Sequence, residues 1–307
     1  MTVCIAAVCG MGTPGGPFIV AAADRMITIG ELEYEPAQTK TIALATLTIG
    51  LFAGDMLLHG AVVPRAIAKL KGGGYNTSDL KVSEIAEAYA DEFANYRRGL
   101  AERHTLSPLN MTFDSFLRRQ KDMAHYQVDI ITDQLQSFSI DSTAIVAGLD
   151  STGGHLYRVE NPGRAMCYDT PFFVCTGAGE ALARTQFVVS GFDKTWDLPS
   201  TIWLTFLAKA RAESAGGVGS QTDMVLIAGG ADTPIYPLKE EEKNLLYGLY
   251  ENTLHDERMA AVKASDAIAE YIKAGLAAAA TTGDATTQAA TEATPVEEPS
   301  PKKDDAD

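Results

Sequence analysis

Four residues near the amino terminus of this 307-residue chain have types and a spacing that could support nucleophilic catalysis. Thr2 follows Met1, and Met-Thr is a pair from which the initiator methionine is usually removed. A threonine exposed in this way carries nucleophile and base together, because its free α-amine has an ordinary pKa of about 7.7 to 8.0 and can accept the hydroxyl proton. Because many proteins begin with Met-Thr, this start alone is a weak indication of catalysis, and the other residues near Thr2 must support it.

Asp24, Lys40 and Gly54 are those residues, and each stands at one end of an apolar run. A lysine ammonium held by Asp24 would favour ionisation of the Thr2 hydroxyl and assist proton transfer. The amide of Gly54, at a strand-to-helix turn, could donate a hydrogen bond to a developing oxyanion. Taken singly, a turn aspartate, an edge-strand lysine and a turn glycine are the simpler interpretations.

Short apolar runs separated by turn sequences must bring these residues together. TVCIAAVC and FIVAAAD flank the turn-rich GMGTPGGP and predict a hairpin that returns Asp24 to the side of Thr2. KTIALAT and TIGLFAG predict a second hairpin, and TAIVAGLD and HLYRVEN a third. FFVCTGAG and TDMVLIAGG predict two further strands.

Helical spacing of apolar residues predicts helices over 54–70, 83–104, 180–192, 199–215 and 239–276. Pro64 predicts a kink or break in the first of these, and a break is also expected near Asn252 in the last. The alternation of strand groups with pairs of helices predicts an α+β fold, a four-layer αββα sandwich of two antiparallel sheets covered by helices. A doubly wound parallel sheet fits less well, because hairpins need antiparallel pairs.

The predicted body spans residues 1–276, including a less readable insertion at about 105–142 and the C-terminal helical segment 239–276. Residues 277–307 are rich in Ala, Thr, Pro and acids and are expected to be disordered, because they cannot bury enough apolar surface to offset their ordering entropy.

Composition limits the compartment and the partners. No basic leader and no apolar run of about 20 residues is present, so a cytoplasmic location is expected. The 25 basic and 40 acidic residues give a net charge of −15, which argues against nucleic acid and anionic membranes as partners. The four cysteines lack zinc-like spacing and the histidines are scattered, so neither a metal nor another cofactor is expected.

The same four residues, with the flanks TVCIAAVC, AAADRMIT, TKTIAL and GLFAGD, resemble the N-terminal half of proteasome β subunits, which are N-terminal-nucleophile hydrolases. The Asp24-to-Lys40 and Lys40-to-Gly54 spacings match that family without a gap, whereas the interval from Thr2 to Asp24 is longer by an insertion in GMGTPGGP. The resemblance covers about residues 2–230, and the start without a propeptide is similar to the bacterial proteasome-like (Anbu-like) members.

The resemblance implies a role for each residue. Thr2 would be nucleophile and, through its amine, general base; Lys40 would tune the hydroxyl, Asp24 would hold Lys40, and the Gly54 amide would serve the oxyanion. It also implies a homo-oligomer, a ring or a stack, in which the insertion at 105–142 could line an interface or cover the site.

Substrates of that family lie as an extra strand between two loops. In this chain the loops match Met26–Thr28 and Phe52–Met56, so the resemblance implies that Thr28, Phe52 and Met56 contact a peptide or amide substrate. Phe52 would then form a wall of a pocket for small or medium apolar side chains.

Two regions depart from the family pattern. Ala178 stands where the family usually carries a serine that helps to orient the terminal amine, and Glu213 and Gly216 replace an aspartate and a second serine. Thr176, Ser214 or Ser220 could compensate. Two alternatives therefore stay open: an inactive homologue with a structural or binding role, and an amidase or acyltransferase that uses the same threonine on a small substrate. The sequence identifies neither the natural substrate nor a regulatory ATPase.

Overall fold

The computed structural model describes residues 2–29, 32–37, 39–72, 80–230 and 233–291, with side chains described up to residue 276 except those of residues 28 and 29. The chain divides into two compact units, Met1–Leu246 and Tyr247–Asp307. Both sheets described below belong to the first unit.

Two five-stranded antiparallel sheets form the centre of the first unit. One sheet has the order β10-β1-β2-β11-β12, with strands Phe173–Gly177, Val3–Cys9, Phe18–Asp24, Thr222–Ala228 and Ile235–Pro237. The other has the order β5-β6-β7-β8-β9, with strands Thr41–Ala45, Thr48–Gly54, Ser142–Asp150, Gly153–Glu160 and Arg164–Cys167. β3 (Ile27–Ile29) and β4 (Leu32–Tyr34) pair as a separate two-stranded antiparallel sheet.

The two sheets share a core of small and branched side chains. In β1, Cys4, Ala6 and Val8 belong to the core between the sheets. Their neighbours Val3 and Ile5 belong to a second core against helices, because successive side chains of a strand point to opposite faces. Both faces of β1 are therefore buried, which explains its nearly continuous apolar sequence.

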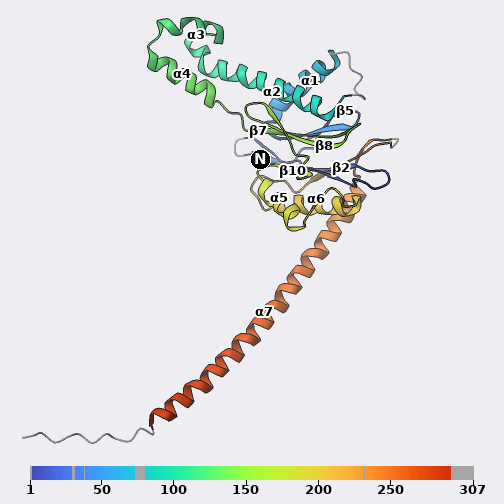
Figure 1. Ribbon diagram of the computed structural model, residues 1–307, viewed down its shortest axis with the longest axis vertical. Coiled ribbons are helices and arrows are strands. Elements are labelled where there is room, and N and C mark those ends of the chain that lie inside the picture. The colour runs from blue at the N-terminus through green and yellow to red at the C-terminus, as the bar shows by residue number, and fades with distance from the viewer. Residues whose placement is uncertain (1, 30–31, 38, 73–79, 231–232, 292–307) are drawn as a thin grey trace, which may run out of the picture. The chain divides into compact units, whose positions relative to one another are not determined.

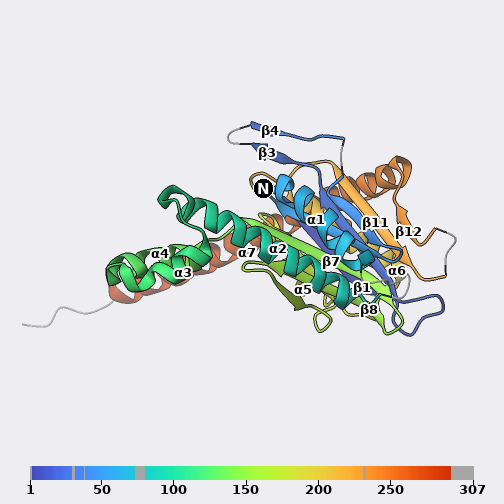
Figure 2. The ribbon, with the colours of Figure 1, turned by 90° about the horizontal axis from the view of Figure 1, so that it is seen from above.

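Helices cover the outer face of each sheet (Figures 1 and 2). α1 (Met56–Gly72) and α2 (Val82–Thr105) pack on the sheet that contains β6 and β7. α5 (Glu180–Val189) and α6 (Leu198–Ala212) pack on the sheet that contains β1. The α+β class and the two antiparallel sheets expected from the sequence are confirmed. Of the kink or break expected at Pro64, the break is wrong, because α1 continues through this residue.

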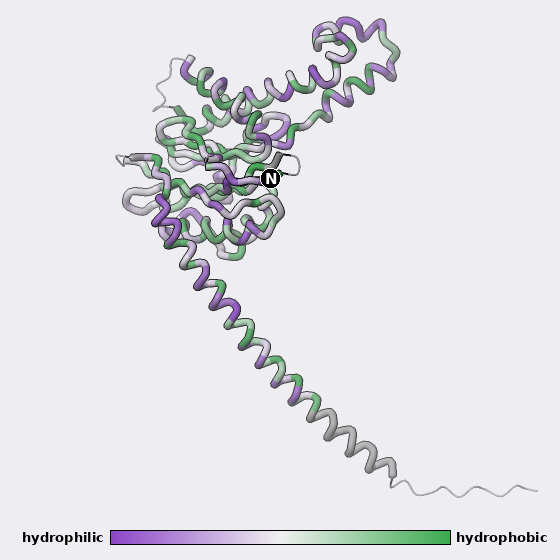
Figure 3. Tube along the Cα trace, turned by 180° about the vertical axis from the view of Figure 1, so that it is seen from behind, coloured by the Kyte–Doolittle hydropathy of each residue, from purple (hydrophilic) through white to green (hydrophobic). Residues whose placement is uncertain are grey.

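A helical arm follows α2 and corresponds to the less readable stretch at 105–142. It consists of the end of α2, the turns η1 (Ser107–Leu109) and η2 (Gln120–Asp122), and the helices α3 (Phe113–Arg119) and α4 (His125–Ser137). Leu106, Phe116 and Ile131 form a small core of its own. The arm projects beyond the sheets (Figures 1 and 2), and hydrophobic and hydrophilic residues alternate along its helices (Figure 3).

The last helix, α7 (Glu240–Thr291), is continuous through Asn252, where a break was expected. It also extends beyond residue 276, where a disordered tail was expected to begin; the remainder of that tail, 292–307, lies outside the described residues. Alanine is the strongest helix former, so the alanine-rich segment after residue 276 can satisfy its backbone locally without a packed core. None of the described helices has both the length and the apolar character needed to cross a membrane.

Candidate active site

Thr2, Asp24 and Lys40 meet at one end of the two sheets. The β1–β2 hairpin pairs Cys4 with Ala23, and this register returns Asp24 to the start of β1. The Thr2 hydroxyl donates to Asp24 Oδ1 and accepts from the Lys40 ammonium. Lys40 Nζ also lies 3.2 Å from Asp24 Oδ1 and 3.3 Å from Oδ2. The structure thus brings together the three side chains that the sequence singled out.

Burial and backbone donors fix the Asp24 carboxylate. Asp24 and Lys40 are only 0% and 3% exposed. The amide of Val3 donates to Oδ1 at 2.9 Å, and the amides of Met26 and Gly219 donate to Oδ2 at 2.9 and 3.0 Å. Hydrogen bonds to a carboxylate stabilise its charged form, so Asp24 can hold an ammonium beside the Thr2 hydroxyl.

A cavity of about 480 Å³ opens beside Thr2, and Gly54 lines it. Gly54 has φ +94°, and a Cβ at this position would lie 2.1 Å from the carbonyl oxygen of Asp141. Only glycine fits this backbone at this close approach. The amide of the next residue, Asp55, donates a hydrogen bond to Ser142 Oγ at 2.9 Å.

The wall of this cavity carries charged residues that the sequence analysis missed. Arg158 and Glu180 both line it, and Arg158 Nη1 donates to Glu180 Oε1 at 3.0 Å. Burial opposes the charge of Arg158, but Glu180 and Glu160 prevail and raise its pKa. No local signal marked either residue, because Arg158 lies in an ordinary strand sequence and Glu180 in an ordinary first turn of a helix.

A second buried lysine supports Asp24 from the other side. Lys209 is 0% exposed, and its Nζ donates to Glu213 Oε1 at 2.6 Å, to Gly219 O at 2.8 Å and to Ser220 O at 2.9 Å. Burial lowers the pKa of Lys209, against the opposing effect of Glu213. Burial likewise raises the pKa of Glu213, against Lys209. Because the Gly219 amide holds Asp24, Lys209 fixes one of the groups that orient the carboxylate.

The three expected substrate contacts have different outcomes. Phe52 is fully buried, with its ring 4.7 Å from that of His59 and 5.7 Å from that of Tyr89, on the helix-facing side of β6. It does not line the cavity beside Thr2, which corrects the expectation that it forms a pocket wall. Met56 packs against the same core at the start of α1. Thr28 lies in β3, and its side chain is outside the described residues.

One of the positions that differ from the proteasome pattern, Ala178, lies at the cavity, whereas Glu213 and Gly216 do not line it. Ala178 is exposed and lines it, so no hydroxyl is present at that point. The nearby Thr176 hydroxyl is engaged with Thr143 Oγ1 at 2.6 Å. Cys4 is no competing nucleophile, because burial raises the pKa of its thiol to about 12 in spite of Lys40.

Within the described part of the chain, no group of three or more His, Cys, Asp or Glu side chains is arranged to hold a metal ion. No model of a known protein family matches the chain, and no curated protein matches it. The functional argument therefore depends on the geometry around Thr2.

Proposed function

We propose that this protein is a threonine-type peptidase or amidase, in which Thr2 forms an acyl-enzyme after removal of Met1. One observation carries the proposal: the Thr2 hydroxyl is bonded to both Lys40 and Asp24 at a buried position that opens onto a cavity. The resemblance to proteasome β subunits supports it, and the two antiparallel sheets with helices on both outer faces are compatible with the sandwich of that hydrolase class.

In the proposed reaction, the free α-amine of Thr2 takes the hydroxyl proton and Oγ1 attacks the substrate carbonyl carbon. The carbonyl electrons move to its oxygen, and the Gly54 amide donates to this oxyanion. Collapse of the intermediate breaks the C–N bond, and the protonated Thr2 amine gives its proton to the leaving amine. Water then attacks the ester and releases the acid.

Lys40 acts in this scheme as a fixed positive charge. Its ammonium stabilises negative charge on Oγ1, and Asp24 holds it there at 3.2 and 3.3 Å. Lys209 and Gly219 in turn orient Asp24.

The same proposal makes the protein a cytoplasmic enzyme that works as a homo-oligomer on a peptide or amide. Native mass spectrometry would measure the subunit number, and a monomer at micromolar concentration would contradict this part of the proposal.

The chemical test begins with the intact mass of the purified protein, which should lack Met1. A threonine-directed β-lactone or epoxyketone should then add one equivalent of mass, and peptide mapping should locate it on Thr2. Thr2→Ala should abolish the adduct, whereas Thr185→Ala, a change to an exposed threonine of α5 that does not line this cavity, should leave Thr2 reactive. Retention of Met1, or no adduct on Thr2, would refute the proposal and favour an inactive homologue.

A further inference from the structure

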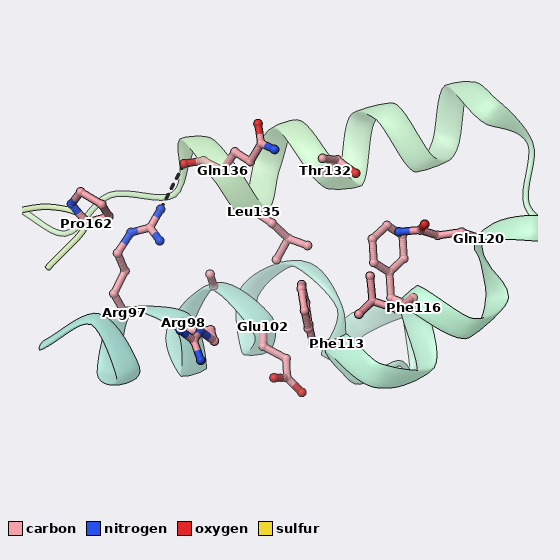
Figure 4. Close-up of a pocket in the computed structure, with 12 residues that line it drawn as sticks. Arg97, Arg98, Glu102, Phe113, Phe116, Gln120, Thr132, Leu135, Gln136 and Pro162 are labelled. Carbon is pink, nitrogen blue, oxygen red and sulfur yellow. Dashed lines mark hydrogen bonds between the residues drawn. The ribbon is translucent and has the colours of Figure 1, made fainter. Parts of the chain in front are cut away.

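The arm contains a cavity of about 450 Å³ between α2, α3 and α4 (Figure 4). It shares no lining residue with the cavity beside Thr2. Its volume lies within the range of about 300–1,000 Å³ that is typical of small-molecule sites. Nothing in the proposed reaction uses it.

One end of this arm cavity is apolar. Phe113, Phe116 and Leu117 of α3 line it. Phe116 is buried in the core of the arm, but Phe113 and Leu117 remain 41% and 50% exposed. An apolar group placed between these two side chains would remove their surface and its own from water, which is favourable.

The other end of the arm cavity is charged, with two arginines and one carboxylate, Glu102, in its lining. Arg97 and Arg98 of α2 line it near Pro162 (Figure 4). Arg97 is already engaged, because it donates to Phe138 O at 2.8 Å and to Gln136 O at 3.1 Å. Arg98 has no hydrogen bond or ion pair to any residue in the described part of the chain. Its guanidinium is therefore free to bind a carboxylate in the two-point manner that suits this pair.

We propose that the arm cavity binds a medium-chain monocarboxylate of the fatty-acid type, with the carboxylate at Arg98 and the chain between Phe113 and Leu117. The lining has two arginines against one glutamate at one end and is largely apolar at the other, so its net positive charge and its apolar surface match this amphiphile. A peptide fits less well, because its backbone would bring polar groups to the apolar end, where Gln120 and Thr132 are the polar neighbours. The inference does not depend on the reaction of Thr2.

Calorimetric titration of the full chain with octanoate, decanoate and dodecanoate, each below its micelle concentration, tests the apolar end. Each two-carbon extension should tighten Kd, by at most about fourfold per methylene. Leu117→Gln should weaken decanoate binding. Leu109→Gln, which alters a similarly exposed leucine outside the cavity, should not.

Decanol and two arginine variants test the charged end of the cavity. Decanol should bind at least about tenfold more weakly than decanoate, because it cannot form the charged hydrogen bonds. Arg98→Gln should remove most of this difference, whereas Arg103→Gln, on the same helix but outside the cavity, should preserve it. Three results would overturn the proposal: no heat with any carboxylate, equal binding of decanol and decanoate, or a chain that dimerises through Leu117 and binds none of them.

Discussion

The Asp24–Lys40 pair gives the sharpest test of the site. Asp24→Asn removes the negative charge that faces Lys40 Nζ at 3.2 and 3.3 Å and leaves an ammonium that is 3% exposed without this counter-ion. Removal of one partner from a buried ion pair costs about 3–5 kcal/mol. Asparagine also has a single acceptor oxygen, so it cannot satisfy the amides that now donate to both Oδ1 and Oδ2. Against a total stability of about 5–15 kcal/mol, this loss is large.

Lys40→Met should cost less, about 1.5–3 kcal/mol, because Asp24 keeps its three backbone donors when the ammonium is lost. The double variant removes both charges and should recover at least about 1 kcal/mol relative to the sum of the single losses. Urea denaturation at pH 7 measures the three values. Lys69→Met serves as the control, because its ion pair with Asp91 has side chains that are 47% and 64% exposed and should contribute less than about 1 kcal/mol.

Reactivity separates chemistry from stability in these variants. Labelling of Thr2 by the β-lactone should be lost in both single variants and in the double variant, although the latter regains stability. Additivity of the two stability losses within about 0.5 kcal/mol would refute the coupling inferred from the distances. Recovery of labelling in the double variant would show that neither charge serves Thr2.

Three further predictions concern neighbouring groups. Lys209→Met should slow labelling of Thr2 because it frees the loop of Gly219, and Lys209→Arg should restore part of the rate. Burial lowers the pKa of His59 to about 4, so the folded protein favours the neutral form of this side chain. As the pH falls, His59 of the unfolded chain therefore binds a proton before His59 of the folded chain does. The free energy of unfolding, measured by urea denaturation, should fall by about 3 kcal/mol between pH 6.5 and pH 4, and it should fall by less in His59→Phe. Ala178→Ser, which places a hydroxyl in the cavity, should accelerate labelling, and an unchanged rate would contradict that role.

Hairpins were the part of the fold that the sequence predicted best. The runs at 18–24 and 48–54 coincide with β2 and β6, and the turn-rich segments between runs correctly paired neighbouring strands. The meeting of Thr2 with Asp24 followed from the same local pairing. Hairpins are predictable because their partners are close in sequence and their turns have a distinctive composition.

Long-range packing explains what the sequence did not predict. Phe52 lies in a run whose two faces are both buried, so no polar neighbour revealed that its ring faces the helices. The arm helices depend on contacts among Leu106, Phe116 and Ile131, which belong to different helical segments with no turn signal that pairs them. Lys209 sits on an apolar helix, and its partner carbonyl at Gly219 lies on a later loop. Periodicity carries no information on such pairings.

Stability alone is a weak reason for the charges around Asp24. A buried ion pair can often be replaced by apolar residues at little cost or with a gain in stability. Here one carboxylate is bonded to a threonine hydroxyl, a buried lysine and three amides, and one of those amides is fixed by a second buried lysine. A packing role for Asp24 would not require the hydroxyl to face a cavity beside Gly54. A catalytic role does require the Thr2 hydroxyl to face a cavity, because a substrate must reach the nucleophile beside the fixed positive charge of Lys40. The buried charges of Asp24 and Lys40 therefore favour chemistry at Thr2 over a purely structural role.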